Sequence, residues 1–197
     1  MHDAERVKIF GDVGEAFVRE WLKAAGYCVI PISLIDNGGA PMLEDYVRSN
    51  VLPDILCALR GLPLWVDVKS KARATKNRQR GRWETGCALR HFEHYCAVAA
   101  RTGIPGALAF LHARESRLFL GALDDLTVGA AVFRGPFPPG HAFTEPMIFF
   151  DLDRFSWYVL EDSAGLRIVQ DAASPAAVLR PWEVAIPKHR QPYIPGL

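Results

Sequence analysis

Residues 53–69 read PDILCALRGLPLWVDVK and hold two short apolar runs on either side of Arg60-Gly61. Towards its end the second run alternates apolar and polar side chains, which is typical of a strand with two different faces. One face carries Leu64, Val66 and Val68, and the other carries Trp65, Asp67 and Lys69. We therefore expect a β-hairpin from which Asp67 and Lys69 project side by side.

The register of this hairpin decides where Asp54 lies. A two-residue turn at Arg60-Gly61 places Asp54 opposite Asp67, whereas a four-residue loop places Asp54 opposite Lys69. Because directly opposed residues share a face of the sheet, both registers gather Asp54, Asp67 and Lys69 into one cluster. A slip of one residue would break the cluster, and the sequence leaves that alternative open.

Two carboxylates and a lysine in one cluster need a physical reason, because neighbouring like charges repel and raise the pKa of one carboxyl. A bound divalent cation supplies that reason, and carboxylate oxygens suit Mg²⁺ or Mn²⁺. The alternative interpretation is an exposed edge strand on which Asp67 and Lys69 form an ordinary i,i+2 charge pair.

The sequence Pro53-Asp54, followed after a gap by Asp67-Val68-Lys69, resembles the PD-(D/E)xK nuclease superfamily, whose members cut nucleic acid with Mg²⁺. Glu15, within GDVGEAFVREWLKAAGY, matches the glutamate that many members carry on the first helix, and this segment looks like that of archaeal Holliday-junction resolvases. Tyr95 matches the tyrosine of the Gln-x-x-x-Tyr motif, with His91 at the position of the glutamine. The resemblance covers about residues 5–115.

The resemblance implies an α/β fold with a restriction-endonuclease-like core, in which helices flank a central mixed β-sheet. We expect residues 1–115 to form this core. Residues 116–197 would form a β-rich extension that completes the sheet or makes a subdomain, with a proline-rich tail.

The resemblance also implies a set of catalytic residues, namely Glu15, Asp54, Asp67 and Lys69. Asp54, Asp67 and the backbone carbonyl of Val68 would bind Mg²⁺ or Mn²⁺, with Glu15 acting directly or through water. Lys69 would either orient or deprotonate the attacking water, or stabilise charge that develops on the phosphate. Since opposite charges keep a lysine protonated, we favour positioning and charge stabilisation.

Two segments have the period of amphipathic helices, residues 5–25 and residues 86–101. Glu15 falls at the border of the first apolar sector, where it can lean into a cleft; alternatively it completes a capping box with Asp12. Tyr95 lies on the apolar stripe of the second helix, either as a supporting residue of the site together with His91 or as a core aromatic.

Residues 69–82 read KSKARATKNRQRGR and carry seven positive charges and no acid. We expect nucleic-acid contacts, since basic residues bind phosphates and an exposed aromatic ring stacks on bases. The candidates are Lys71, Arg73, Lys76, Arg78, Arg80, Arg82 and Trp83. The alternative is a solvated loop, which is how charge runs usually behave.

Further strands are expected at 27–30, 106–112, 117–123, 147–152, 155–160 and 166–170. Residues 42–52 are ambiguous and could form a short helix, and residues 124–146 are mostly loop because of their turn residues. The sequence Lys188-His189-Arg190 in the tail is a second, weaker candidate for nucleic-acid contact.

The overall composition bounds the remaining expectations. A chain of 197 residues, half of them hydrophobic, suits one domain with a sizeable core, and a net charge of +1 excludes a polybasic binder. Four cysteines without a C-x-x-C pair favour reduced thiols and a cytoplasmic location. We find no signal-peptide hydrophobic region and no apolar run long enough to span a membrane.

The sequence therefore predicts a Mg²⁺-dependent endonuclease that hydrolyses DNA phosphodiester bonds, branched or otherwise structured DNA included. RNA remains an open alternative substrate, and analogy with resolvases predicts a homodimer. A non-catalytic nucleic-acid-binding subunit that keeps the nuclease fold is the second hypothesis. An enzyme acting on a small phosphorylated substrate is the third, because fold alone does not determine function.

Overall fold

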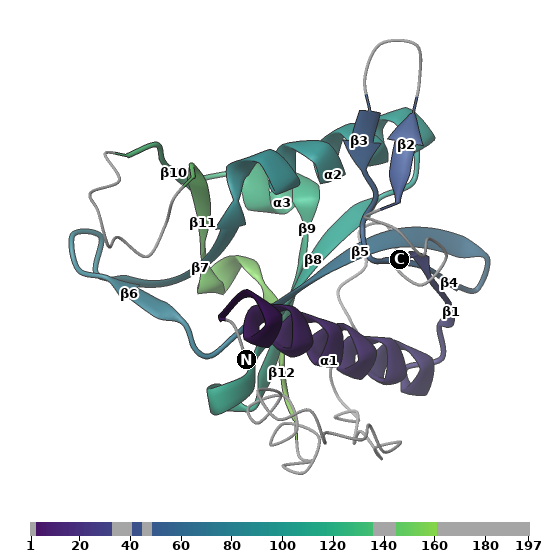
Figure 1. The fold of residues 1–197 in the computed structure, drawn as a ribbon, viewed down its shortest axis with the longest axis horizontal. Coiled ribbons are helices and arrows are strands. Elements are labelled where there is room, and N and C mark those ends of the chain that lie inside the picture. The colour runs from purple at the N-terminus through teal and green to yellow at the C-terminus, as the bar shows by residue number, and fades with distance from the viewer. Residues whose placement is uncertain (1–2, 33–40, 45–48, 136–144, 161–197) are drawn as a thin grey trace.

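A central six-stranded mixed sheet carries the candidate residues, and Figure 1 shows it in the computed structural model with its helices. The structure describes residues 3–32, 41–44, 49–135 and 145–160. The expected strand at 166–170, the proline-rich tail and Lys188-His189-Arg190 lie outside these residues. The fold is mixed α/β, with helices flanking the central sheet, as the sequence predicts.

The central sheet has the strand order β1-β4-β5-β8-β9-β12, and a second sheet has the order β10-β11-β7-β6. The strands of the central sheet are β1 (Cys28–Pro31), β4 (Ile55–Leu59), β5 (Leu62–Lys71), β8 (Gly106–His112), β9 (Arg117–Ala122) and β12 (Ser156–Val159). Those of the second sheet are β6 (Thr75–Asn77), β7 (Arg82–Ala88), β10 (Ala131–Phe133) and β11 (Met147–Asp151). The helices are α1 (Asp3–Ala24), α2 (Leu89–Thr102) and α3 (Leu123–Thr127).

The β4–β5 hairpin adopts the two-residue turn. Leu59 pairs with Leu62 and Ile55 with Val66, so this register continues to Asp54 opposite Asp67. Arg60 and Gly61 have φ angles of +52° and +83°, and two positive φ angles in succession characterise the tight hairpin turn whose twist matches the strands. On its other side β5 pairs in parallel with β8, which makes the sheet mixed.

Helix α1 covers the sheet face that carries Val66 and Val68. Phe17, Trp21 and Leu22 point into this core and are almost fully buried. A Cβ on Gly14 would lie 1.7 Å from Ser70 Oγ, so glycine is needed here for the helix to approach β5. The helix begins at Asp3, which places Asp12 in its interior, and the capping-box interpretation of Glu15 is therefore wrong.

Helix α2 and the second sheet cover the opposite face. Phe92 and Tyr95 of α2 pack with Leu108 and Phe110 of β8 in a cluster rich in aromatic rings. The helix begins at Leu89, later than the predicted residue 86, because residues 86–88 belong to β7 and pair with β11. Asp67 and Lys69 lie on this face of β5, since their neighbours in the strand face α1.

Several short elements differ from the expectation. The ambiguous segment 42–52 contains two paired strands, β2 (Met42–Glu44) and β3 (Ser49–Val51), and the described residues of this segment contain no helix. Helix α3 and β10 lie within the expected loop 124–146. Strands β9 and β12 join the central sheet, whereas β10 and β11 join the second sheet. The domain division at residue 115 stays a prediction.

Candidate metal centre and nucleic-acid interface

Asp54, Asp67 and Lys69 come together where β4 begins beside β5. Asp54 Oδ2 accepts a hydrogen bond of 2.8 Å from the backbone N–H of Val68. Lys69 Nζ lies 2.5 Å from Asp67 Oδ2 and donates a hydrogen bond of 3.1 Å to the hydroxyl of Tyr95. The hairpin supplies the charged groups, and α2 supplies the hydroxyl that holds the lysine.

Asp67 is the most buried acid of the cluster, with 1% of its side chain exposed. Lys69 contacts Oδ2 as an ion pair, and the Tyr95 hydroxyl also interacts with this carboxylate, but neither oxygen makes a well-formed hydrogen bond with a described residue. Leaving a buried carboxylate without hydrogen bonds costs free energy. The carboxylate therefore keeps lone pairs with which it could coordinate a cation beside the Lys69 ammonium.

The electrostatics of the cluster are set by burial and by mutual charge. Burial raises the pKa of Asp54 well above its usual value, the charge of Asp67 raises it further, and Lys69 offsets only part of the effect. Burial alone would lower the pKa of Lys69, but Asp67, Tyr95 and Asp54 together outweigh it and raise that pKa. Lys69 therefore carries its positive charge at neutral pH.

Glu15 lies near this cluster without joining it. Its side chain on α1 pairs with Arg19 at 3.2 Å, and its negative charge contributes to the raised pKa of Asp54. Among the described residues no three His, Cys, Asp or Glu side chains lie close enough to share a metal ion. A role for Glu15 through water stays a prediction.

The available ligand atoms fit a hard divalent cation. The two carboxylates and the Val68 carbonyl are oxygen ligands of the kind that Mg²⁺ and Mn²⁺ prefer. Lys69 Nζ lies 3.5 Å from the Val68 carbonyl oxygen as well as 2.5 Å from Asp67. The ammonium thus lies beside the same oxygens that would bind the metal.

Tyr95 contacts Lys69 from α2, and His91 lies beside Tyr95. Tyr95 is 4% exposed and belongs to the aromatic core, while its hydroxyl reaches Lys69, so the residue is both a core aromatic and a neighbour of the cluster. The His91 ring lies 6.3 Å from the Tyr95 ring, centroid to centroid. Burial lowers the pKa of His91, and the charges of Lys69 and Arg90 lower it further.

The basic segment is an ordered hairpin rather than a loop. Strand β5 continues to Lys71, and β6 then pairs with β7. Arg73, Lys76 and Arg78 are exposed, and Lys76 Nζ lies 5.9 Å from the centre of the Trp83 ring, which is 51% exposed. Burial lowers the pKa of Lys71.

Arg80 and Arg82 differ from the other basic residues because acids neutralise them. Arg80 pairs with Glu84 at 2.9 Å and with Asp151 at 3.5 Å, and Arg82 pairs with Asp151 at 2.5 Å. Asp151 lies on β11 opposite Glu84, so these ion pairs join two strands of the second sheet. Sequence reasoning missed this, since no local pattern connects Asp151 to the basic segment.

Lys71, Arg73, Lys76 and Arg78 form no ion pair with another described residue. Among the basic residues predicted to contact nucleic acid, these four are therefore the better candidates for phosphate contacts. Within the described ranges, no helix combines the length and apolar character needed to cross a bilayer.

Comparison with solved structures finds similar chains. No family model matches the chain, and no curated protein matches it. Among solved structures the chain is similar to Hjc, a Holliday junction resolvase from the archaeal hyperthermophile Archaeoglobus fulgidus. The two are 14% identical, the match covers 74% of this chain and 86% of that chain, and the TM-score is 0.45.

Proposed function

We propose that this protein is a Mg²⁺- or Mn²⁺-dependent endonuclease of the PD-(D/E)xK type that hydrolyses DNA phosphodiester bonds. The observation that carries the proposal is the buried carboxylate of Asp67, which makes no well-formed hydrogen bond within the described chain and lies beside Asp54 and the Lys69 ammonium. A purely structural aspartate at 1% exposure would be expected to have its oxygens hydrogen-bonded. An aspartate that binds a cation instead uses its carboxylate oxygens as metal ligands.

Asp54, Asp67 and the Val68 carbonyl would hold the cation, with Glu15 acting through water. A bound divalent cation lowers the pKa of its water and offsets the charge of the scissile phosphate. The N–H of Val68 orients the Asp54 carboxylate by its 2.8 Å hydrogen bond. This hydrogen bond connects one proposed ligand to the backbone of another.

Lys69 would act as a charged positioning group for the phosphate. Its raised pKa makes it a poor proton acceptor at neutral pH, so it does not suit the role of general base. The Tyr95 hydroxyl holds the Lys69 ammonium by a hydrogen bond. The ammonium would then stabilise the negative charge that develops on the phosphate during cleavage. Tyr95 is then a positioning residue that acts through Lys69.

The β6–β7 hairpin and the end of β5 would bind the DNA. Arg73, Lys76 and Arg78 are exposed, and they form no ion pair with other described residues. Each phosphate that such a residue neutralises steepens the dependence of affinity on salt concentration. Structured or branched DNA as substrate, a homodimer and a cytoplasmic location complete the proposal.

Cleavage of three DNA substrates tests the proposal. We would compare a four-way junction, the matched linear duplex and a single strand, each with Mg²⁺, Mn²⁺, Ca²⁺ or EDTA. Wild-type protein is expected to cleave only with Mg²⁺ or Mn²⁺, and Asp67→Asn is expected to lose at least a hundredfold in rate. Glu93→Gln on the exposed side of α2 is the control and should keep the wild-type rate. Equal, negligible cleavage by wild type and Asp67→Asn would refute the proposal.

A second function has one observation in its favour. The ammonium of Lys69 already compensates Asp67, and the described residues hold no group of three potential metal ligands. A non-catalytic subunit that keeps this fold would bind nucleic acid through Arg73 and Arg78 without metal. Binding that is unaffected by EDTA and by Asp54→Asn, together with absence of cleavage, would identify this second function.

A further inference from the structure

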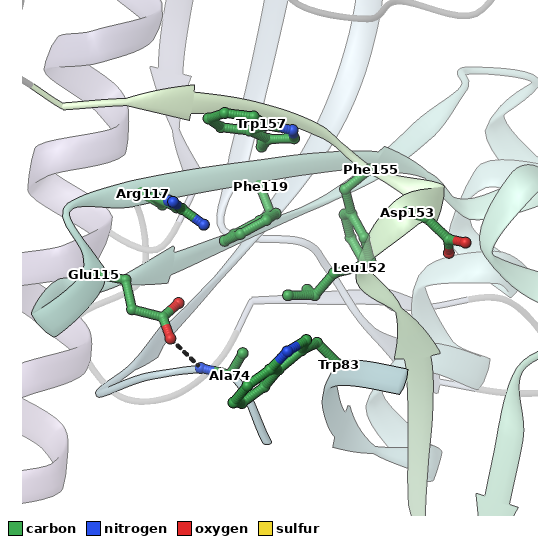
Figure 2. A pocket seen from close by; sticks show the side chains of 9 residues that line it. All are labelled: Ala74, Trp83, Glu115, Arg117, Phe119, Leu152, Asp153, Phe155 and Trp157. Carbon is green, nitrogen blue, oxygen red and sulfur yellow. Dashed lines mark hydrogen bonds between the residues drawn. The ribbon is translucent and has the colours of Figure 1, made fainter. Parts of the chain in front are cut away.

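A cavity of about 730 Å³ lies between the start of β7 and the strands β9 and β12, and its lining includes none of Asp54, Asp67 and Lys69, which are called the acidic cluster below. Its walls are mostly aromatic or apolar, and three charged side chains border it. Figure 2 shows Trp83 and Trp157 at opposite ends, with Phe119 and Leu152 between them. This size falls in the usual range for sites that bind small molecules or single groups of a larger ligand.

The cavity opens on the same face of the central sheet as the acidic cluster. Lys69 pairs with Phe110, Phe110 with Phe119, and Phe119 with Trp157, so these four residues form one row across four strands. Directly opposed residues share a face. The middle of this row is buried under α2 and the second sheet, where Phe110 and Phe119 are at most 3% exposed, so the cluster and the cavity lie at its two ends.

The rings of the cavity combine aromatic surface with positive charge. Lys76 Nζ lies 5.9 Å from the centre of the Trp83 ring, and the Arg117 guanidinium lies 5.1 Å from the centre of the Trp157 ring. Trp83 remains 51% exposed. Flat apolar surface beside cations suits a planar base joined to a phosphate.

Two carboxylates add hydrogen-bond acceptors at the rim. Glu115 is anchored, since one oxygen accepts the N–H of Ala74 at 3.2 Å and the other lies 3.0 Å from His112 Nδ1. The side chain of Asp153 is exposed, and its charge acts on Arg82. Such acceptors suit the exocyclic amino groups of adenine, cytosine or guanine.

We propose that this cavity receives one unpaired nucleobase, which stacks on Trp83 while Arg117 and Lys76 contact its flanking phosphates. This inference rests on the proposed nuclease function and specifies its substrate as DNA with an extruded or single-stranded nucleotide. The C-terminal strands β9 and β12, to which sequence analysis assigned no functional role, supply the wall opposite Trp83. A fully paired duplex offers no base for this site, since its bases remain stacked inside the helix.

Binding without cleavage tests the inference on the full chain. Anisotropy of a labelled duplex with one unpaired adenine would be measured in EDTA, next to the perfectly paired duplex and a duplex with an abasic residue at the unpaired position. Wild type is expected to prefer the unpaired adenine roughly tenfold over both, the order expected for one base stacked on an aromatic ring. Trp83→Ala is expected to abolish the preference, and Trp83→Phe to keep most of it.

Two further variants separate stacking from general binding. Arg117→Gln removes the cation over Trp157 and is expected to reduce the preference several-fold. Leu62→Ala changes an exposed apolar residue in the β4–β5 turn and is the matched control, with no change expected. Combining Trp83→Ala with the abasic duplex should cause no further loss, because both changes remove the same contact.

The outcomes distinguish the two proposals. Equal affinity of wild type for the three duplexes, or an unchanged preference in both Trp83→Ala and Arg117→Gln, overturns the base site even if Mg²⁺-dependent cleavage is found. A preference that depends on Trp83 supports the base site even if no cleavage is found, in which case the nuclease proposal alone fails.

Discussion

Lys69 and Asp67 lie two residues apart on β5, and Lys69 Nζ contacts Asp67 Oδ2 at 2.5 Å. The exposed fractions of the two side chains differ, at 21% for the lysine and 1% for the aspartate. Lys69 is therefore the more exposed partner of the pair. A cation that binds Oδ2 of Asp67 would have to displace the ammonium from this oxygen.

Replacing Lys69 by methionine should destabilise the protein, because it leaves a buried carboxylate without its ion-pair partner. We expect the free energy of unfolding to fall by up to about 3 kcal/mol, as measured by urea denaturation in EDTA. Lys71→Met is the matched control, since Lys71 faces the same side of β5 without an ion pair to a described residue, and a small change is expected there. Mg²⁺ should recover part of the loss in Lys69→Met; equal stability of the two variants would contradict the prediction.

The raised pKa of Asp54 predicts stability that falls as pH rises. The folded protein keeps the Asp54 proton to higher pH than the unfolded chain does, so stability is lost between about pH 4 and the raised folded pKa. Asp54→Asn removes this loss and should be more stable than wild type at pH 8 in EDTA. Urea denaturation of both proteins at pH 5 and pH 8 measures this difference in the free energy of unfolding.

Metal binding should raise the stability of wild type at pH 8, and it should not raise the stability of Asp54→Asn. Mn²⁺ at a hundred times its dissociation constant is expected to add about 2.7 kcal/mol to the stability of wild type and nothing to that of Asp54→Asn. Thermal unfolding with and without Mn²⁺ at pH 8 checks this. A similar rise in both proteins would argue against Asp54 as a ligand.

Gly14→Ala should push α1 away from β5, since its new Cβ would lie 1.7 Å from Ser70 Oγ and 3.0 Å from Ser70 Cβ. We expect a loss of about 1–3 kcal/mol, the usual cost of overpacking, together with slower cleavage, because Glu15 would move with the helix. Gly11→Ala is the matched control: its Cβ meets nothing within 4 Å, so about 1 kcal/mol of added stability is expected from helix propensity. Rescue of Gly14→Ala by Ser70→Gly would identify the clash as the cause.

His112 predicts a loss of stability in mild acid. The ring is fully buried between Thr85 Oγ1 and Glu115 Oε2, both at 3.0 Å, and burial lowers its pKa although Glu115 opposes the shift. The unfolded chain therefore takes up the proton first, and stability falls as pH drops below about 6.5. His112→Leu should show a weaker dependence between pH 7 and pH 5, at a cost of about 2 kcal/mol at pH 7 from the unpaired Thr85 hydroxyl. His94→Leu is the control; an unchanged pH dependence in His112→Leu would contradict the assignment.

The β4–β5 hairpin could be predicted because its information is local. Alternation in the second run sets the faces, and Gly61 accepts the positive φ that a two-residue turn requires. The juxtaposition of Asp54, Asp67 and Lys69 follows from this turn and from strand geometry. The hydrogen bond from Lys69 to Tyr95 could not be derived that way, because it depends on how α2 docks.

Other parts of the fold depend on distant partners that no local pattern reveals. Strands β2 and β3 have three residues each and exist through pairing with one another, so residues 42–52 carried no clear period. From the sequence, Arg80 and Arg82 were expected to be available for phosphate contacts. In the fold, β11 places Asp151 beside both of them. The walls of the cavity come from β7, β9 and β12, which are far apart in the chain.

The row from Lys69 through Phe110 and Phe119 to Trp157 has a further consequence. Neighbouring strands keep a nearly constant spacing, so the backbones at the two ends of this row are held roughly 14 Å apart. Because Trp157 is one wall of the cavity, the cavity also lies at a fixed distance from Asp67 and Lys69. A nucleotide held in the cavity would then determine which phosphodiester bond of the same strand reaches the cluster. Such an arrangement would cut at a set number of nucleotides from the unpaired base, whatever the surrounding sequence.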